Sequence, residues 1–220
     1  MTFTKITSQE PVAAYLYEHI ATNLAQGKRV LWLIPGGSAI PIAQAVIRQL
    51  ANIDVSKLAI TLTDERYVSV GHADENWKVI MKGAPALDGT KLVPVNTGKS
   101  MKETTKAYAQ NIQKLLDWAD VCIGFFGIGP DGHTAGILPL SPAATSTLLV
   151  ASYDAGNFKR ITITPLAIKR LNLAVAYAVG PEKAPVLEKL DQSIDIPTMP
   201  SQALKTAKQT IIFNDYRGDK

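Results

Sequence analysis

Short apolar runs rich in β-branched and aromatic residues alternate along this chain with longer segments of helical period. This alternation is typical of an α/β fold whose sheet is largely parallel. We therefore expect an open, mainly parallel sheet flanked by helices, doubly wound and Rossmann-like, with a few additional strands. The expected strands are residues 29–35, 57–63, 91–96, 121–129, 147–153, 160–164, 173–179 and 210–214; the expected helices are 11–26, 36–50, 74–83, 101–119, 165–171 and 181–190.

The length and composition suit one domain. A chain of 220 residues, of which 46% are hydrophobic, can bury one large core, so we expect a single domain spanning residues 1–220. No apolar stretch approaches the roughly 20 residues that span a bilayer, and the first residues lack the layout of a secretory signal. These features predict a cytoplasmic protein with no membrane partner. Cys122 is the only cysteine, which excludes an intrachain disulfide, and its apolar surroundings predict burial.

The charge distribution argues against nucleic acid. The formal net charge is +4 and the pI is about 9.1, yet no run of five basic residues and no helix-turn-helix segment occurs. A small anionic ligand fits this excess of positive charge. The three histidines are well separated and no cysteine or histidine spacing suits a metal, so we expect neither a metal site nor a cofactor. The sequence does not indicate an oligomeric state.

Three loops of unusual composition follow predicted strands. They are Gly36-Gly37-Ser38, the Asp-Glu-Arg segment at 64–66, and the segment Gly-Pro-Asp-Gly-His-Thr at 129–134. In open α/β sheets, ligands bind beyond the carboxyl ends of the strands. The three loops therefore predict one shared cleft.

Residues 127–132 match the G-x-G-x-x-G pattern of a dinucleotide-binding loop. Asp154 also lies at about the distance of the acidic residue in that motif. However, Pro139 and Pro142 interrupt any helix within about two turns, and such a segment is too short for a crossover to a parallel neighbour. The glycines are thus better explained by a tight turn at Asp131-Gly132.

That turn would hold His133 rigidly at the floor of the cleft. Histidine titrates near neutrality, so a fixed histidine at a strand end is a candidate general base or acid. The alternative is that His133 merely packs under the turn. Asp131 either orients the imidazole or an attacking water, or serves only as a turn-forming side chain.

The three loops, with "RITITPLAI" and "VGPEKAPVLEKL", resemble the 6-phosphogluconolactonase family and, more distantly, the glucosamine-6-phosphate deaminases. The resemblance covers roughly residues 36–189, and Arg66 at a position where the deaminases usually have tyrosine favours the lactonases. The chain departs from the family at Pro35, Glu75 and Gly136, where the lactonases usually have serine. It also keeps only "IIFND" of the usual carboxyl-terminal segment.

The resemblance implies hydrolysis of 6-phospho-D-glucono-1,5-lactone to 6-phospho-D-gluconate, in the oxidative pentose phosphate pathway. It implies that His133 is the general base on water, and it places Arg160 and Lys183 near the phosphate. Gly36, Gly37 and Ser38 would bind that phosphate at a helix N-terminus, although they could equally form a simple strand-to-helix turn. Arg160 and Lys183 could likewise be solvated surface charges.

The second loop offers further candidates. Arg66 has the fixed donor geometry to hold either the phosphate or an oxyanion, and we count it with Asp131 and His133 as catalytic. Asp64 and Asn76 are candidates for the sugar hydroxyls. The alternatives are an ion-paired cluster of Asp64, Glu65 and Arg66, and a helix-terminal role for Asn76.

Two other functions remain open at this stage. One is an isomerase or deaminase acting on an amino sugar phosphate, and the other is a sugar-phosphate sensor without turnover. His19 and His72 are expected outside the site, on the first helix and in an exposed loop.

Overall fold

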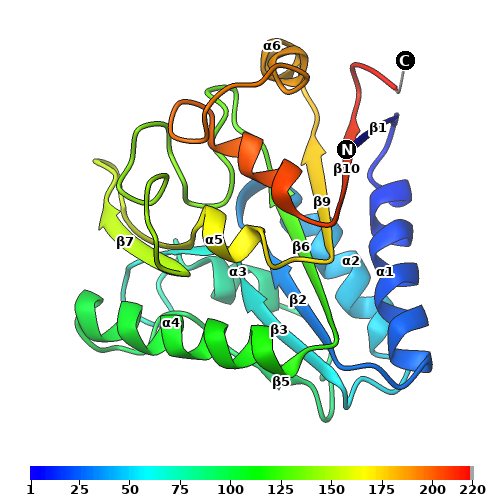
Figure 1. Ribbon diagram of the computed structural model, residues 1–220. Helices are drawn as coiled ribbons and strands as arrows, with labels where there is room; N and C mark the ends of the chain where they lie inside the picture. Colours follow the sequence, from blue (N-terminus) through cyan, green and yellow to red (C-terminus); the bar gives the residue numbers. More distant parts are fainter. Residues whose placement is uncertain (219–220) are drawn as a thin grey trace.

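The computed structural model describes residues 1–218, and its main feature is a seven-stranded sheet (Figure 1). All of its strand pairs are parallel, in the order β1-β10-β9-β6-β2-β3-β5. The expected fold class is therefore confirmed. The strands are β1 (Thr2–Lys5), β2 (Val30–Ile34), β3 (Leu58–Leu62), β5 (Lys91–Leu92), β6 (Val121–Gly127), β9 (Leu173–Ala178) and β10 (Gln209–Asn214).

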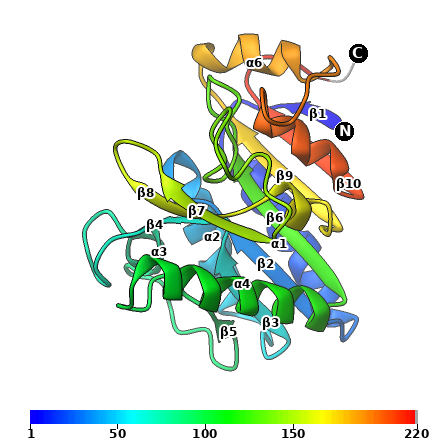
Figure 2. The same ribbon diagram turned by 60° about the vertical axis from the view of Figure 1, so that its left-hand side comes forward.

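Helices cover both faces of this sheet. Helices α1 and α2 pack together on one face, while α4 crosses the other face (Figure 2). The central strands β2, β3 and β9 are buried along their whole length, which explains their uninterrupted apolar sequences. The α-helices are α1 (Glu10–Ala25), α2 (Ile40–Leu50), α3 (Asn76–Met81), α4 (Met101–Trp118), α5 (Pro165–Ile168) and α6 (Ala184–Lys189); the 3₁₀ helices are η1 (Gly37–Ala39), η2 (Pro181–Lys183) and η3 (Pro200–Thr206).

Local signals explain both ends of helix α1 and the start of helix α4. Helix α1 has proline in its first turn and stops just before Gly27, which adopts a positive φ of 75°. Helix α4 starts with a capping box, in which the Ser100 side chain accepts from the Glu103 N–H and the Glu103 carboxylate accepts from the Ser100 N–H. Both helices lie within one residue of their expected bounds.

A second, three-stranded antiparallel sheet holds β4 (Asp64–Arg66), β8 (Lys159–Ile163) and β7 (Val150–Asp154). The sequence predicted the last two as strands but predicted Asp-Glu-Arg as a loop, which is wrong. The segment forms β4, which pairs with β8 so that Asp64 faces Thr162 and Arg66 faces Arg160. Three polar residues carry no readable periodicity, so only the partner strand reveals them as a strand.

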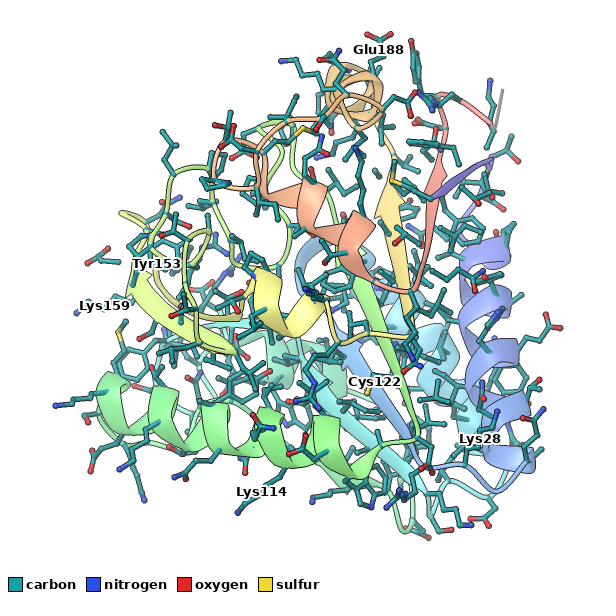
Figure 3. All side chains as sticks on the ribbon, in the orientation of Figure 1. Lys28, Lys114, Cys122, Tyr153, Lys159 and Glu188 are labelled. Atoms are coloured by element: carbon teal, nitrogen blue, oxygen red, sulfur yellow. The ribbon has the colours of Figure 1, made fainter. Side chains whose placement is uncertain are left out.

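Other differences also concern short elements. The sequence did not predict β1 or η3, and the strand expected over 91–96 extends only over Lys91–Leu92. The helices expected over 165–171 and 181–190 are shorter, and the second begins as 3₁₀ helix η2. Cys122 is buried in β6, as predicted (Figure 3). Within residues 1–218, no helix is both long and apolar enough to cross a membrane.

Candidate active site

A cleft of about 240 Å³ opens beyond the carboxyl ends of four adjacent strands, β9, β6, β2 and β3. Strand β2 leads to the glycine loop, β3 to the Asp-Glu-Arg segment and β6 to the histidine turn. This is the crevice in which open α/β sheets bind ligands. The cleft brings together nine of the ten predicted site residues, namely Gly36, Gly37, Ser38, Asp64, Arg66, Asn76, His133, Arg160 and Lys183.

Asp131, the tenth predicted residue, contacts His133 directly. Its Oδ1 lies 2.6 Å from the imidazole Nδ1 and also accepts a 3.1 Å hydrogen bond from the backbone N–H of His133. The turn is closed by the Gly132 N–H, which donates to the Gly129 carbonyl at 3.0 Å, while Gly132 has a φ of 85°. The dinucleotide interpretation is thereby excluded, because this turn leads into bends and bridges instead of a helix.

The charge on Asp131 determines the form of the imidazole. Burial raises the pKa of the Asp131 carboxyl, but the backbone N–H of His133, the charge of its imidazolium form and its ring N–H together outweigh burial and hold this pKa below its ordinary value. An ionised carboxylate can only accept hydrogen bonds, so Nδ1 of a neutral His133 carries the proton. The lone pair is then on Nε2, which leaves that nitrogen able to accept a proton.

Gly129 is a site residue whose role the sequence analysis missed. A Cβ at this position would lie 2.0 Å from Nδ1 of His133 and 2.6 Å from Oδ1 of Asp131. The backbone of Gly129 therefore forms the surface against which the Asp–His pair lies. The G-x-G-x-x-G pattern contained this signal, but a pattern of glycines does not tell which one contacts a side chain.

The glycine loop after β2 packs closely against α3. Gly37 has a φ of 69°, which favours glycine, and a Cβ on Gly36 would lie 2.5 Å from the amide group of Asn76. The loop leads through η1 into α2, so its N–H groups belong to the start of a helical segment. Such a segment is suited to an anionic ligand.

Three cations surround the same cleft. Arg66 and Arg160 are direct partners across the β4–β8 pair, so two positive side chains lie next to each other. Like charges in this position destabilise a sheet unless anions compensate them. Asp64 lies 3.4 Å from Arg160 and Asp74 lies 3.4 Å from Arg66, while Lys183 lies 3.6 Å from Glu182.

The arginine side chains are held in place by further contacts. The guanidinium of Arg66 lies 4.5 Å from the ring centroid of Phe158. The Nε of Arg160 is buried and has no hydrogen-bond partner within residues 1–218. Asp64 is buried beside both arginines; burial raises its pKa, whereas Arg160, Thr63, His133 and Arg66 act in the opposite direction. The cleft thus holds three cations, and the buried Nε of Arg160 is a donor that an anionic ligand can use.

Glu65 does not line the cleft, and it does not form the ion pair with Arg66 that one interpretation of the sequence offered. Its carboxylate instead accepts three backbone N–H groups, from Arg66, Asn76 and Trp77, at 2.8 to 2.9 Å. The predicted helix-terminal position of Asn76 is correct, since Asn76 is the first residue of α3. Asn76 also lines the cleft and donates from Nδ2 to the carbonyl of Asp64 at 3.3 Å.

Two departures from the family pattern have local structural reasons. A Cβ on Gly136 would lie 2.9 Å from Cβ of Thr162 and 3.1 Å from Cβ of Asp64, so a serine does not fit this backbone. Tyr153, labelled in Figure 3, donates its hydroxyl to the Gly136 carbonyl at 2.6 Å. Glu75 is buried and accepts a 2.6 Å hydrogen bond from the Gly71 N–H, which holds the preceding loop.

Comparison with known proteins gives consistent results. The family model described as glucosamine-6-phosphate isomerases/6-phosphogluconolactonase matches residues 5–213. A protein of Pseudomonas putida named 6-phosphogluconolactonase is 24% identical over 212 residues, covering 90% of this chain and 87% of its own length. A Rhizobium meliloti protein of the same name is 26% identical, covering 89% of this chain and 88% of its own.

Solved structures show the same fold. The crystal structure of a 6-phosphogluconolactonase from Shewanella baltica superposes with a TM-score of 0.82 at 21% identity, covering 97% of each chain. The corresponding structure from Thermotoga maritima gives a TM-score of 0.80 at 20% identity, covering 97% of this chain and 98% of that one.

Proposed function

This chain belongs to the family of glucosamine-6-phosphate isomerases and 6-phosphogluconolactonases, and we propose that it hydrolyses 6-phospho-D-glucono-1,5-lactone to 6-phospho-D-gluconate. The names of its relatives and Arg66 in the second loop favour this reaction over isomerisation of an amino sugar. We also propose one domain spanning residues 1–220, acting in the cytoplasm within the oxidative pentose phosphate pathway.

The observation that carries this proposal is the Asp131–His133 pair in a cleft with three cations. Lactone hydrolysis needs a base for water, stabilisation of the oxyanion and a grip on the distant phosphate. Nε2 of His133 takes a proton from water as the water oxygen bonds to the carbonyl carbon. When the tetrahedral intermediate breaks down, the bond to the ring oxygen breaks and His133 returns the proton to that oxygen.

Asp131 keeps the imidazole in the required tautomer. Its short hydrogen bond to Nδ1 also stabilises the imidazolium that exists between the two proton transfers. Arg66, whose guanidinium is already oriented by Phe158 and Asp74, stabilises the negative charge that forms on the carbonyl oxygen.

The remaining residues bind the substrate. The phosphate lies against Gly36, Gly37 and Ser38 and is neutralised by Arg160 and Lys183. This assignment gives the spare Nε donor of Arg160 a partner.

Asp64 and Asn76 bind sugar hydroxyls. Both line the cleft, and both are fixed by protein contacts, Asp64 through Arg160 and Asn76 through the Asp64 carbonyl.

The decisive experiment is a rapid lactone-hydrolysis assay, corrected for the spontaneous reaction, on the wild type and His133→Ala. General acid–base catalysis contributes about 10²- to 10⁴-fold, so kcat should fall by that factor while KM changes much less. Equal effects on kcat and KM would contradict the role of base. Release of ammonia from glucosamine 6-phosphate would favour the isomerase branch of the family, and binding of 6-phosphogluconate without turnover would favour a sensor.

A further inference from the structure

Glu65 is a buried carboxylate that the proposed mechanism does not use. Its side chain is 0% exposed and lies behind the cleft, between β4 and the start of α3. Oε1 accepts the N–H groups of both Arg66 and Asn76 at 2.8 Å, and Oε2 accepts that of Trp77 at 2.9 Å. A buried carboxylate is costly unless its oxygens are fully bonded, so this arrangement calls for an explanation.

Helix α3 has no cap from its own N-terminal segment. Glu75 at the N-cap position makes no side-chain capping bond, and its carboxylate bonds instead to Gly71. The first N–H groups of a helix need partners from outside the helix. Glu65, eleven residues earlier on β4, supplies the partner for Asn76 and Trp77.

Two of the three bonded amides belong to residues whose side chains line the cleft. Oε1 fixes the backbone of Arg66 relative to that of Asn76, although the two lie on different elements. Asn76 in turn packs against Gly36, where an added Cβ would lie only 2.5 Å from the Asn76 amide group. A displacement of α3 would therefore move one substrate contact directly and open the packing against the glycine loop.

We propose that Glu65 is a positioning residue of the active site, which sets the relative placement of Arg66 and Asn76 through their backbone amides. The kinetic part of this inference rests on the proposed lactonase function. The length of the Glu65 side chain is what matters in this role, because Oε1 must reach the N–H groups of Arg66 and Asn76 at the same time.

This proposal separates the effect of side-chain length from the effect of charge. Glu65→Gln keeps the length, and its Oε1 can still accept from both Arg66 and Asn76, while its NH₂ group faces the N–H of Trp77. Glu65→Asp keeps the charge but is one methylene shorter, so it cannot bridge the same amides. Positioning predicts that the glutamine variant works better than the aspartate variant, and a purely electrostatic role predicts the reverse order.

The test compares Glu65→Gln, Glu65→Asp and the control Glu75→Asp in the lactone assay, with folding checked by circular dichroism. Glu75 is a suitable control because it is also a buried carboxylate next to Asn76, yet its partner is Gly71, outside the cleft. We expect kcat/KM to fall at least tenfold in Glu65→Asp, by less than threefold in Glu65→Gln, and by less than twofold in Glu75→Asp.

Hydrogen exchange at the Asn76 amide gives a readout that needs no substrate, and we expect it to accelerate in Glu65→Asp. Faster exchange with unchanged kinetics, or an equal loss of kcat/KM in Glu75→Asp, would overturn the positioning role. An aspartate variant more active than the glutamine variant would do the same. A wild type that exchanges slowly at Asn76 but does not hydrolyse the lactone would refute only the proposed reaction.

Discussion

Replacing Gly129 with alanine should inactivate the enzyme although no catalytic side chain is changed. Gly129 has no positive φ, so its backbone accepts alanine, and the substitution acts only through the added methyl. That methyl would lie 2.0 Å from Nδ1 of His133 and 2.6 Å from Oδ1 of Asp131. Ordinary contacts begin at about 3.4 Å, so the imidazole must move by at least about 1.4 Å.

A displacement of this size determines the expected magnitude. A misplacement of about 1 Å in a reacting group can cost about 10²-fold in rate, which corresponds to about 2.7 kcal/mol in the activation free energy. Because the methyl also separates Asp131 from Nδ1, the imidazole loses the contact that selects its tautomer. We therefore expect kcat of Gly129→Ala to fall by about 10²-fold or more, close to the value for His133→Ala.

Gly127→Ala is the matched control. It adds the same methyl two residues earlier, at a position where a Cβ meets no atom within 4 Å. We expect its kcat to stay within about twofold of the wild type, and any effect to appear in KM. Steady-state lactone hydrolysis measures all three proteins. A Gly129→Ala variant that is folded and has wild-type kcat would refute the view that the turn holds His133 in its reactive position.

Three further outcomes are expected. Asp131→Asn should lower kcat of lactone hydrolysis by up to about 10⁴-fold, because an amide can donate to Nδ1 and select the wrong tautomer of His133. An unchanged kcat would mean that Asp131 serves only to form the turn. Lys183→Ala should raise KM by at least about tenfold and change kcat by less than threefold, since the ammonium binds the phosphate, away from the reacting carbonyl. A large fall in kcat with an unchanged KM would exclude phosphate binding by Lys183. Burial raises the pKa of Glu65 to about 7, although three N–H donors act in the opposite direction. Between about pH 4.5 and 7, Glu65 is therefore protonated in the native state and ionised in the unfolded chain. The stability that protonated Glu65 contributes is therefore complete below about pH 4.5 and is lost as the pH rises through about 7. Measured by urea unfolding, the free energy of unfolding of the wild type should decrease by up to about 3 kcal/mol relative to that of Glu65→Gln over this pH range. A difference between the two proteins that does not change with pH would contradict this burial effect.

Several features of the site could be predicted from the sequence because they depend on near neighbours. The contact between Asp131 and His133 joins residues two apart within one turn, and the glycine that permits the turn stands between them. Apolar runs identified β2, β3, β6 and β9, and the parallel arrangement then placed their following loops at one edge of the sheet. Those two steps were enough to predict one cleft.

Contacts between distant segments could not be predicted in the same way. Arg66 faces Arg160 only because β4 pairs with β8 in one register, and three polar residues contain no signal for that pairing. The role of Glu65 depends on α3 packing behind β4, and that of Gly129 depends on the exact path of the turn beneath an imidazole.

The sequence by itself thus determined the fold class, the long helices, the apolar strands that lead to the three polar segments and the identity of the candidate base, since these follow from local periodicity and turn chemistry. Only the tertiary structure decided which amides a buried carboxylate reaches, which cations become neighbours and which glycine supports the histidine. The physical reason is that hydrogen bonds and steric contacts between distant segments depend on atomic separations, which the packing of the whole chain establishes.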